Sequence, residues 1–270
     1  MSTSDLNGLT SVVTRPRTQA QVSATWLESL GVLVIVFPVL EIEALPDAVI
    51  DINFKHSDLE SADAIIFVSA NAAEFGVAAI NSRGGFSRGA TIFAIGGATA
   101  IKLAEAGIAD VQSPTLGNDS EALLALAALQ HVAGKHILIV RGISEAGGRT
   151  HLQETLNARG ARVEMLECYA RRPITAGVEL QSQIKAELAA GKIHAFSVLS
   201  VETLESLVAN LTLRPISNGL SECMMLVPHA RVADAALKMG FTRVRVVPMG
   251  GEPLHAALLT MKDALLGLQK

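Results

Sequence analysis

Tyr169 is the only tyrosine in the 270-residue chain and lies in the segment EMLECYARRP, residues 164–173. It follows an apolar run and precedes two arginines and a proline. A phenol has an ordinary pKa of about 10, so it keeps its proton at pH 7 and can donate that proton to a departing oxygen. The same side chain could instead anchor a linker by its ring and hydroxyl. The residues alone leave both roles open.

Further polar and glycine residues stand where expected strands end and helices begin. This is the position at which open parallel sheets bind ligands. In the first half of the chain these residues are Arg15, Ser69, Asn71, Gly96, Gly97 and Thr99. In the second half they are Arg141, Gly142, Arg149, Ser200 and Arg231. If each half forms one module, two sets of strand-end residues would line a cleft between the modules.

The glycine-rich stretches do not match nucleotide-binding motifs. AIGGATA, residues 94–100, departs from GxGxxG, and RGISEAGGRT, residues 141–150, has Gly148 where a Walker motif needs lysine. A Gly96-Gly97 turn that requires positive φ is expected whatever the function. Such a turn would also expose backbone donors for a carboxylate. Arg141 and Arg149 could reach an anion from a loop, although solvated surface arginines are the plain alternative.

Ser69 and Ser200 are each expected to cap a helix, which is the commonest use of serine at such a position. Neither lies in GxSxG, so the sequence gives little support to a hydrolase triad. The strand ends also lack the paired carboxylates that a glycosidase needs.

Composition narrows the functional classes. The chain is 28.3 kDa, 50% hydrophobic, with a formal net charge of -4 and a pI of about 6.0, which argues against nucleic-acid binding. Its two cysteines form no metal-ligand or disulfide pattern, so buried structural thiols and no metal site are expected. The first residues contain no signal peptide, and no apolar run approaches the ~20 residues of a membrane span. A soluble cytoplasmic protein is therefore expected.

Apolar runs alternate with amphipathic segments, the pattern of an α/β fold with parallel sheets. Three strand-helix units in the first half recur in the same order in the second. The offsets are nearly constant: Arg15 to Arg141 is 126 residues, Ser69 to Ser200 is 131, and Gly107 to Gly240 is 133. We expect two similar, flavodoxin-like modules.

Several segments occur in the order seen in the uroporphyrinogen-III synthase family, which the chain resembles from about residue 11 to residue 262. These segments are VVTRP, IIFVSANA, FAIGGATA, ILIVRG, GGRTHLQETL, ECYARRP and LVPHARVADAALKMGF. The resemblance implies a discontinuous domain of residues 1–37 and 174–270, an inserted domain of 43–167, and linker strands 38–42 and 168–173. Tyr169 would then sit at the hinge, facing the cleft.

The resemblance also implies the reaction. Members use no cofactor or metal and convert the linear tetrapyrrole hydroxymethylbilane, an octacarboxylate, to uroporphyrinogen III by losing water, inverting ring D and closing the ring. Tyr169 would be the catalytic residue and Thr99 a ligand contact. Many members carry a threonine where this chain has Val232, so Arg231 is expected to supply that contact.

The resemblance further implies a transient contact with the preceding pathway enzyme, and no nucleic-acid or membrane partner. A non-catalytic two-module ligand-binding or regulatory protein is the alternative from another class, since hinged α/β clefts also serve simple capture.

Overall fold

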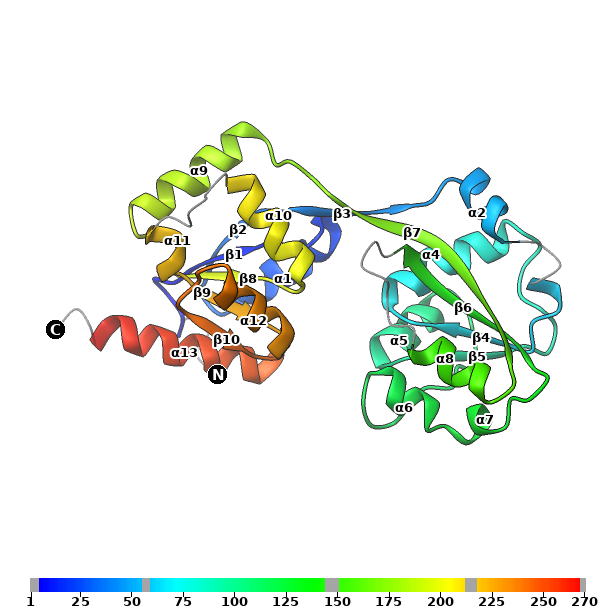
Figure 1. Cartoon of the computed structure of the whole chain (residues 1–270). Helices are drawn as coiled ribbons and strands as arrows, with labels where there is room; N and C mark the ends of the chain where they lie inside the picture. The colour runs from blue at the N-terminus through cyan, green and yellow to red at the C-terminus, as the bar shows by residue number, and fades with distance from the viewer. Residues whose placement is uncertain (1–4, 55–58, 144–150, 212–217, 268–270) are drawn as a thin grey trace. The chain divides into compact units, whose positions relative to one another are not determined.

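The computed structural model describes residues 5–54, 59–143, 151–211 and 218–267 (Figure 1). It contains two five-stranded sheets in which most neighbouring strands run parallel, so the α/β class predicted from the sequence is confirmed. The chain divides into two compact units. Unit 1 comprises Met1–Glu41 with Arg172–Lys270, and unit 2 comprises Ile42–Arg171.

The sheet of unit 1 has the strand order β10-β9-β8-β1-β2. Its strands are β1 (Thr10–Val13), β2 (Leu33–Val36), β8 (Ala195–Ser197), β9 (Met224–Val227) and β10 (Val244–Val246). Its helices are α1 (Arg17–Ser29), α9 (Val178–Ala189), α10 (Val201–Leu211), α11 (Asn218–Glu222), α12 (Ala230–Lys238) and α13 (Gly251–Gly267). Val12 and Val13 point to opposite faces, as strand geometry requires, and belong to separate apolar clusters. Helices α1 and α13 cover the Val13 face, and α9 to α12 cover the other.

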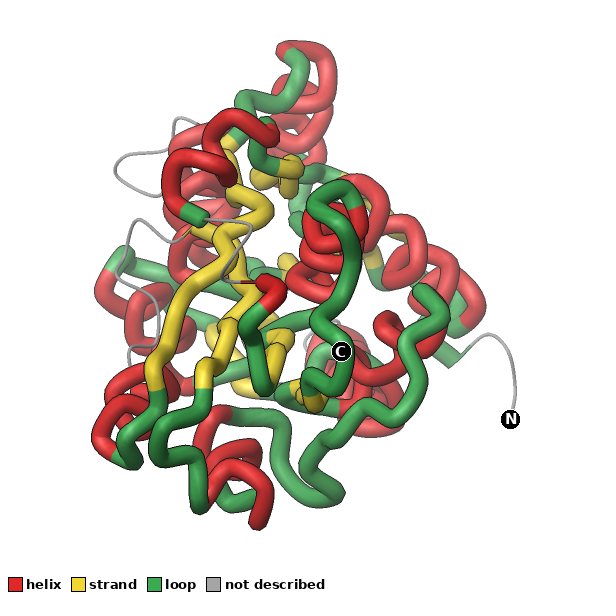
Figure 2. The backbone as a smooth tube through the Cα atoms, turned by 90° about the vertical axis from the view of Figure 1, so that its right-hand side faces the viewer, coloured by secondary structure: helices red, strands yellow, loops and turns green. Residues whose placement is uncertain are grey.

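The sheet of unit 2 has the order β3-β7-β6-β4-β5. Its strands are β3 (Leu40–Ala44), β4 (Ala64–Phe67), β5 (Thr91–Ala94), β6 (His136–Ile143) and β7 (Arg162–Pro173). Its helices are α2 (Asp47–Asn53), α4 (Ala70–Asn81), α5 (Gly97–Glu105), α6 (Ser120–Leu124), α7 (Ala127–Gln130) and α8 (His151–Ala158). Helices α2, α4 and α5 cover one face, and α6 to α8 cover the other. Figure 2 shows strands in yellow between helices in red.

Strands β3 and β7 run antiparallel. The Leu45 N–H donates to the Cys168 carbonyl at 3.0 Å, and the Ile174 N–H donates to the Val39 carbonyl at 3.0 Å. The residue numbers rise on one strand as they fall on the other, which fixes the direction. Both strands also contain a boundary between the two units, at residues 41/42 and 171/172.

The two sheets share a strand order, which is the structural form of the predicted repeat. Reading β2-β1-β8-β9 in unit 1 against β7-β6-β4-β5 in unit 2, β1 corresponds to β6, β8 to β4 and β9 to β5. The grouping of strand ends by halves of the chain is wrong, however. Strand β1 pairs with β8, not with β4, so β1 and β2, drawn in blue in Figure 1, share a sheet with β8, β9 and β10 from the last third of the chain. Arg15 therefore belongs with Ser200 and Arg231, and Arg141 belongs with Ser69.

A glycine follows each of three helices at the point where the helix ends. Gly31, Gly107 and Gly240 follow α1, α5 and α12 with φ of +88°, +81° and +100°, a conformation that favours glycine. Each of these helices thus ends at a local signal.

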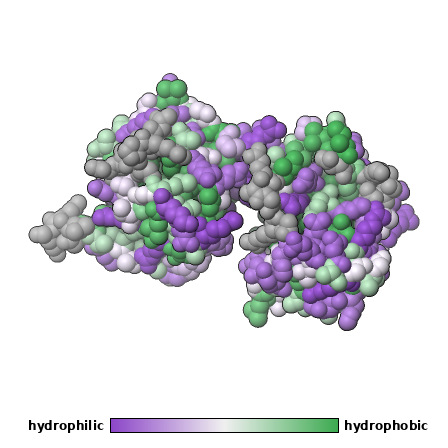
Figure 3. Space-filling model, in the orientation of Figure 1, coloured by the Kyte–Doolittle hydropathy of each residue, from purple (hydrophilic) through white to green (hydrophobic). Residues whose placement is uncertain are grey.

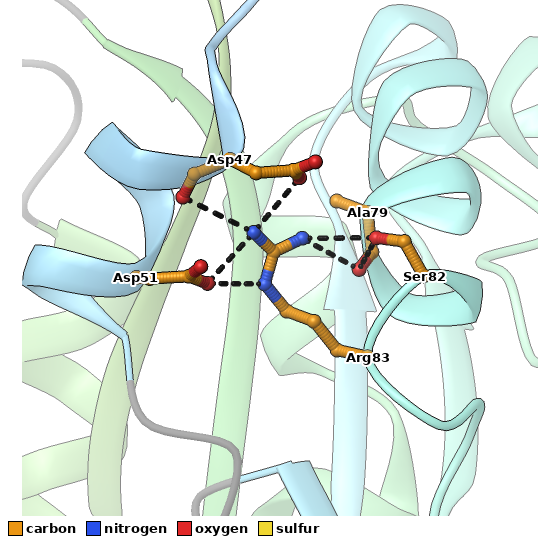
Figure 4. Close-up of polar contacts among 5 residues, drawn as sticks. All are labelled: Asp47, Asp51, Ala79, Ser82 and Arg83. Atoms are coloured by element: carbon orange, nitrogen blue, oxygen red, sulfur yellow. Dashed lines mark hydrogen bonds and ion pairs between the residues drawn. The ribbon is translucent and has the colours of Figure 1, made fainter.

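An arginine cluster ties α2 to the end of α4 (Figure 4). The Arg83 side chain is 9% exposed and forms ion pairs with Asp47 at 3.0 Å and Asp51 at 2.8 Å. It also donates to the Ala79 carbonyl at 2.9 Å and to the Ser82 hydroxyl at 3.1 Å. The cluster thus fastens the short α2 to the helix that Ser69 caps.

On the surface, the face drawn in Figure 3 intersperses hydrophilic and hydrophobic residues. Within the described ranges, no helix has both the length and the apolar character needed to cross a membrane.

Candidate active site

Tyr169 lies in β7 and is 4% exposed. Its hydroxyl is 3.1 Å from the Ser69 hydroxyl. Its ring packs against Phe75 of α4, with ring centroids 5.5 Å apart. The structure therefore brings Tyr169 to the start of α4, a contact between residues 100 positions apart in the sequence.

A β-bulge aims Tyr169 at that helix. In the β6–β7 pairing Arg141 faces Glu167 while Gly142 faces Tyr169, so Cys168 is an extra residue on β7. Leu166, Cys168 and Tyr169 then all belong to the apolar cluster beneath α4. Regular alternation would send Tyr169 to the opposite face, with Met165. The bulge has no signature in the sequence, and it decides which way the phenol points.

Gly142 makes room for the tyrosine ring. A Cβ atom at Gly142 would lie 2.4 Å from Cε2 and 2.6 Å from Cζ of Tyr169. No side chain can occupy that space without moving the ring. Gly142, predicted as a substrate contact, is thus also a packing partner of the predicted catalytic residue.

The prediction that the Gly96-Gly97 turn needs positive φ is wrong. Gly96 has φ of −173°, which is ordinary extended backbone, and Gly97 is the first residue of α5. The reason for glycine at position 96 is space: a Cβ there would meet the Asn118 side chain at 2.4 Å. Nothing lies within 4 Å of a Cβ at Gly97. Asn118 comes from a distant loop and could not be found from local sequence.

Ser69 caps α4, as predicted. Its hydroxyl accepts the Ala72 N–H at 3.0 Å, so one side chain serves both the helix start and Tyr169. Asn71, in the first turn of the same helix, is half-buried. Thr99, in the first turn of α5, is 3% exposed.

Arg141 lies in β6 near its carboxyl end, and its positive charge is balanced by a nearby carboxylate. Its Nε donates to the Gly142 carbonyl at 3.1 Å and lies 3.8 Å from the Glu167 carboxylate. The arginine side chain is 17% exposed. Glu167 was missed as part of this site, since only the register of β7 places it there. Arg149 lies outside the described residues.

Unit 1 holds the remaining predicted residues. Arg15 follows β1 and donates from Nη1 to the Ser23 hydroxyl at 3.0 Å, and burial lowers the pKa of its guanidinium. Ser200 accepts the Thr203 N–H at 3.1 Å and so caps α10, as predicted. Arg231 is exposed in the first turn of α12, while the neighbouring Val232 is 1% exposed in the core. Ser69, Gly142 and Tyr169 are thus in contact, and Arg15, Ser200 and Arg231 belong to a different unit.

The two cysteines, Cys168 and Cys223, are buried and unpaired, as predicted. No group of three His, Cys, Asp or Glu side chains that could hold a metal occurs in the part of the chain that the structure describes.

Comparison with known proteins identifies the relatives of this chain. The family model described as uroporphyrinogen-III synthase HemD matches residues 21–249. The uroporphyrinogen-III synthase of Salmonella typhimurium is 32% identical over 243 residues, covering 87% of this chain and 93% of the relative. That of Escherichia coli is 30% identical over 240 residues with the same coverage. A crystal structure of a mutant uroporphyrinogen III synthase from the extremely thermophilic bacterium Thermus thermophilus aligns over 96% of this chain and 99% of its own, with a TM-score of 0.59 and 20% identity. This last likeness supports the fold.

Proposed function

The chain belongs to the uroporphyrinogen-III synthase family, and we propose that strand-end residues of both units run the family reaction, with Tyr169 as proton donor. The protein is a cyclising lyase of haem biosynthesis. It takes hydroxymethylbilane, removes the ring A hydroxyl as water, and closes the macrocycle with ring D inverted.

The role of Tyr169 as proton donor is supported by the 3.1 Å contact between its hydroxyl and that of Ser69. Ser69 already accepts the Ala72 N–H, so its own proton is available for the tyrosine oxygen. In that arrangement the phenol proton is free to be donated to the leaving hydroxyl. The phenolate that forms would lie near the N-terminus of α4, where negative charge is stabilised.

The proton balance needs no further reagent. Tyr169 gives a proton to the ring A hydroxyl, the C–O bond breaks, and water leaves an azafulvene cation stabilised by the electron-rich pyrrole. Ring D attacks the cation through its substituted carbon and gives a spiro intermediate. The bond from that carbon to the bridge of ring C then breaks, the bridge carbon bonds instead to the free α carbon of ring D, and the proton that this α carbon loses returns to the phenolate. Such chemistry needs mild acid assistance and mainly geometric control.

We propose that the substrate's eight carboxylates are bound by residues at the strand ends. The candidates in unit 2 are Ser69, Asn71, Gly96, Gly97, Thr99, Arg141, Gly142 and Arg149; those in unit 1 are Arg15, Ser200 and Arg231. Helix N-termini and arginines suit carboxylates because backbone N–H groups and guanidinium forks both donate to them.

We also propose the domain plan expected from the family: residues 1–37 with 174–270, an inserted domain of 43–167, linkers of 38–42 and 168–173, and a cleft between the domains. The passage of β3 and β7 across the boundary between the units supports this plan. A cytoplasmic site of action and a transient contact with the preceding pathway enzyme belong to the same proposal.

The function is tested by supplying the purified protein with hydroxymethylbilane generated from porphobilinogen, oxidising the products and separating the uroporphyrin isomers. Uncatalysed closure gives the type I isomer, so the background reaction is distinguished by its own product. Predominant type III product is expected. Type I alone, from folded protein, would exclude synthase activity and favour a non-catalytic binding protein.

A further inference from the structure

Unit 1 contains a cavity of about 190 Å³ on the face of its sheet that α1 and α13 cover. Its polar lining includes Ser11 of β1, Arg15 just beyond the carboxyl end of β1, and Ser197, the last residue of the neighbouring strand β8. Its apolar walls include Trp26, Leu226 and Leu254. The cavity therefore combines one cationic group with hydrophobic walls.

No acidic side chain of the described residues forms an ion pair with the cation in this cavity. The Nε atom of Arg15 is buried and has no hydrogen-bond partner among the described residues. Burial is the only cause that shifts the pKa of Arg15, and it acts downward, as expected when no acid offsets the loss of water. An arginine nevertheless remains protonated at pH 7. A half-buried guanidinium whose Nε donor is unsatisfied favours an anion that can fill this open donor position.

The size of the cavity limits what accompanies that anion. An apolar cavity of about 150 Å³ is known to hold benzene. A volume of 190 Å³ therefore suits one five-membered aromatic ring with a short acidic arm. The indole of Trp26 offers such a ring a surface for stacking, and the hydroxyls of Ser11 and Ser197 offer hydrogen-bond partners.

We propose that this cavity binds one pyrrole ring of the linear tetrapyrrole, with a ring carboxylate on the Arg15 guanidinium. The inference rests on the proposed function and adds a specific place for one ring. Unit 1 would then hold one ring of the substrate, while the proton donor belongs to unit 2.

A larger cavity in unit 1 is the competing location. It has a volume of about 680 Å³ and is lined by His194, Met224 and Arg245, near the amino ends of β8 and β9. The buried unpartnered side-chain atoms found among the described residues belong to Arg15, Ser113 and His255, none of which lines this larger cavity. Its charged groups therefore show no unmet need for a ligand.

Trp26 is the only tryptophan of the chain, so its fluorescence reports on the smaller cavity. The probe is porphobilinogen, a single pyrrole that carries two carboxylates. Saturable quenching or a spectral shift is expected with the natural chain. Arg15→Met should raise the Kd about 10- to 100-fold, the effect of losing a hydrogen bond to a charged group. Arg17→Met is the matched control, because Arg17 is exposed two residues away, and its Kd should not change.

A second measurement needs no variant. With the natural chain, 3-ethyl-4-methylpyrrole, which lacks carboxylates, should bind at least about 10-fold more weakly than porphobilinogen. Equal affinity for both pyrroles, equal Kd for the two arginine variants, or no response of Trp26 would overturn the cavity assignment. If the natural chain still forms type III product in those cases, the proposed function stands. Type I product alone would remove the premise and the proposal together.

Discussion

The two units build the same scaffold and use it differently. In each unit an arginine stands near the carboxyl end of one strand, Arg15 after β1 in unit 1 and Arg141 in β6 in unit 2. A serine caps the helix that follows the neighbouring strand, Ser200 in unit 1 and Ser69 in unit 2. Ser200 hydrogen-bonds within its own helix start, to the Thr203 hydroxyl at 2.8 Å. Ser69 instead contacts Tyr169.

The arginines differ in the same way. Arg141 lies beside Glu167, whereas Arg15 faces a cavity with Nε unpartnered among the described residues. The repeated scaffold thus fixes where polar groups emerge, and partners that are distant in sequence decide what each group can do. We infer that unit 2 supplies the proton and unit 1 holds a carboxylate-bearing ring.

The largest expected effect is the slow labelling of two buried thiols, one in each unit. Cys168 in unit 2 and Cys223 in unit 1 are 1% and 4% exposed, and burial raises the pKa of each to about 12. At pH 8 the thiolate fraction is then roughly a thousandfold below that of a free cysteine, whose pKa is about 8.5. Labelling of Cys223→Ala and Cys168→Ala variants by a thiol reagent should be slowed at least to that degree in both.

The same shift makes stability depend on pH. Above about pH 8.5 the unfolded thiols lose protons that the folded ones keep, so the unfolding free energy should fall as pH rises toward 12. In the labelling experiment, rapid modification of one thiol at pH 8 would contradict the expected protection and show that its unit opens far more easily than the other.

The next effect tests the packing that distinguishes β7. Gly142→Ala would place a methyl group 2.4 Å from the Tyr169 ring, so the ring must move. We expect type III formation to slow by about 100-fold, because a displacement of about 1 Å has that effect on catalysis. Overpacking should also lower the unfolding free energy by about 1–3 kcal/mol.

Gly177→Ala is the control for Gly142→Ala. Its φ is −57° and no atom lies within 4 Å of the new methyl group. Equal rates for the two variants would mean that the position of Tyr169 does not matter to the reaction.

The smallest effect compares the two capping serines. Ser69→Ala and Ser200→Ala each remove one cap and should each lower the unfolding free energy by about 1 kcal/mol in urea titrations. Ser69→Ala should in addition change how the rate of type III formation varies with pH, since Tyr169 loses its partner. Ser69→Thr, which keeps the hydroxyl, should restore the profile. A Ser69→Ala profile identical to that of the natural chain would reduce Ser69 to a cap.

Much of the fold follows from local sequence, and the site follows from it less completely. Helix stops at Gly31 and Gly107 and caps at Ser69 and Ser200 are properties of a few adjacent residues, so they could be predicted. The neighbours of β1 could not be read from the repeat, because equal patterns do not say which copies share a sheet.

Three features of the site depend on distant contacts. The bulge at Cys168 depends on register with β6, the need for glycine at position 96 on Asn118, and the balanced charge of Arg141 on Glu167. Each of these contacts joins segments that are far apart in the chain or whose register is set by strand pairing, so no local pattern reveals the contact. The crossing of the chain between units was implied by family resemblance alone.

The measurement that tests the central claim most directly is the rate of type III formation by Tyr169→Phe. Phenylalanine keeps the ring on Phe75 and removes only the hydroxyl that contacts Ser69. With folding unchanged by circular dichroism, we expect the rate to fall by about 100-fold or more, the usual contribution of a general acid, and type I product to rise. An unchanged rate with type III predominant would contradict the proton-donor role and leave Tyr169 as a structural anchor.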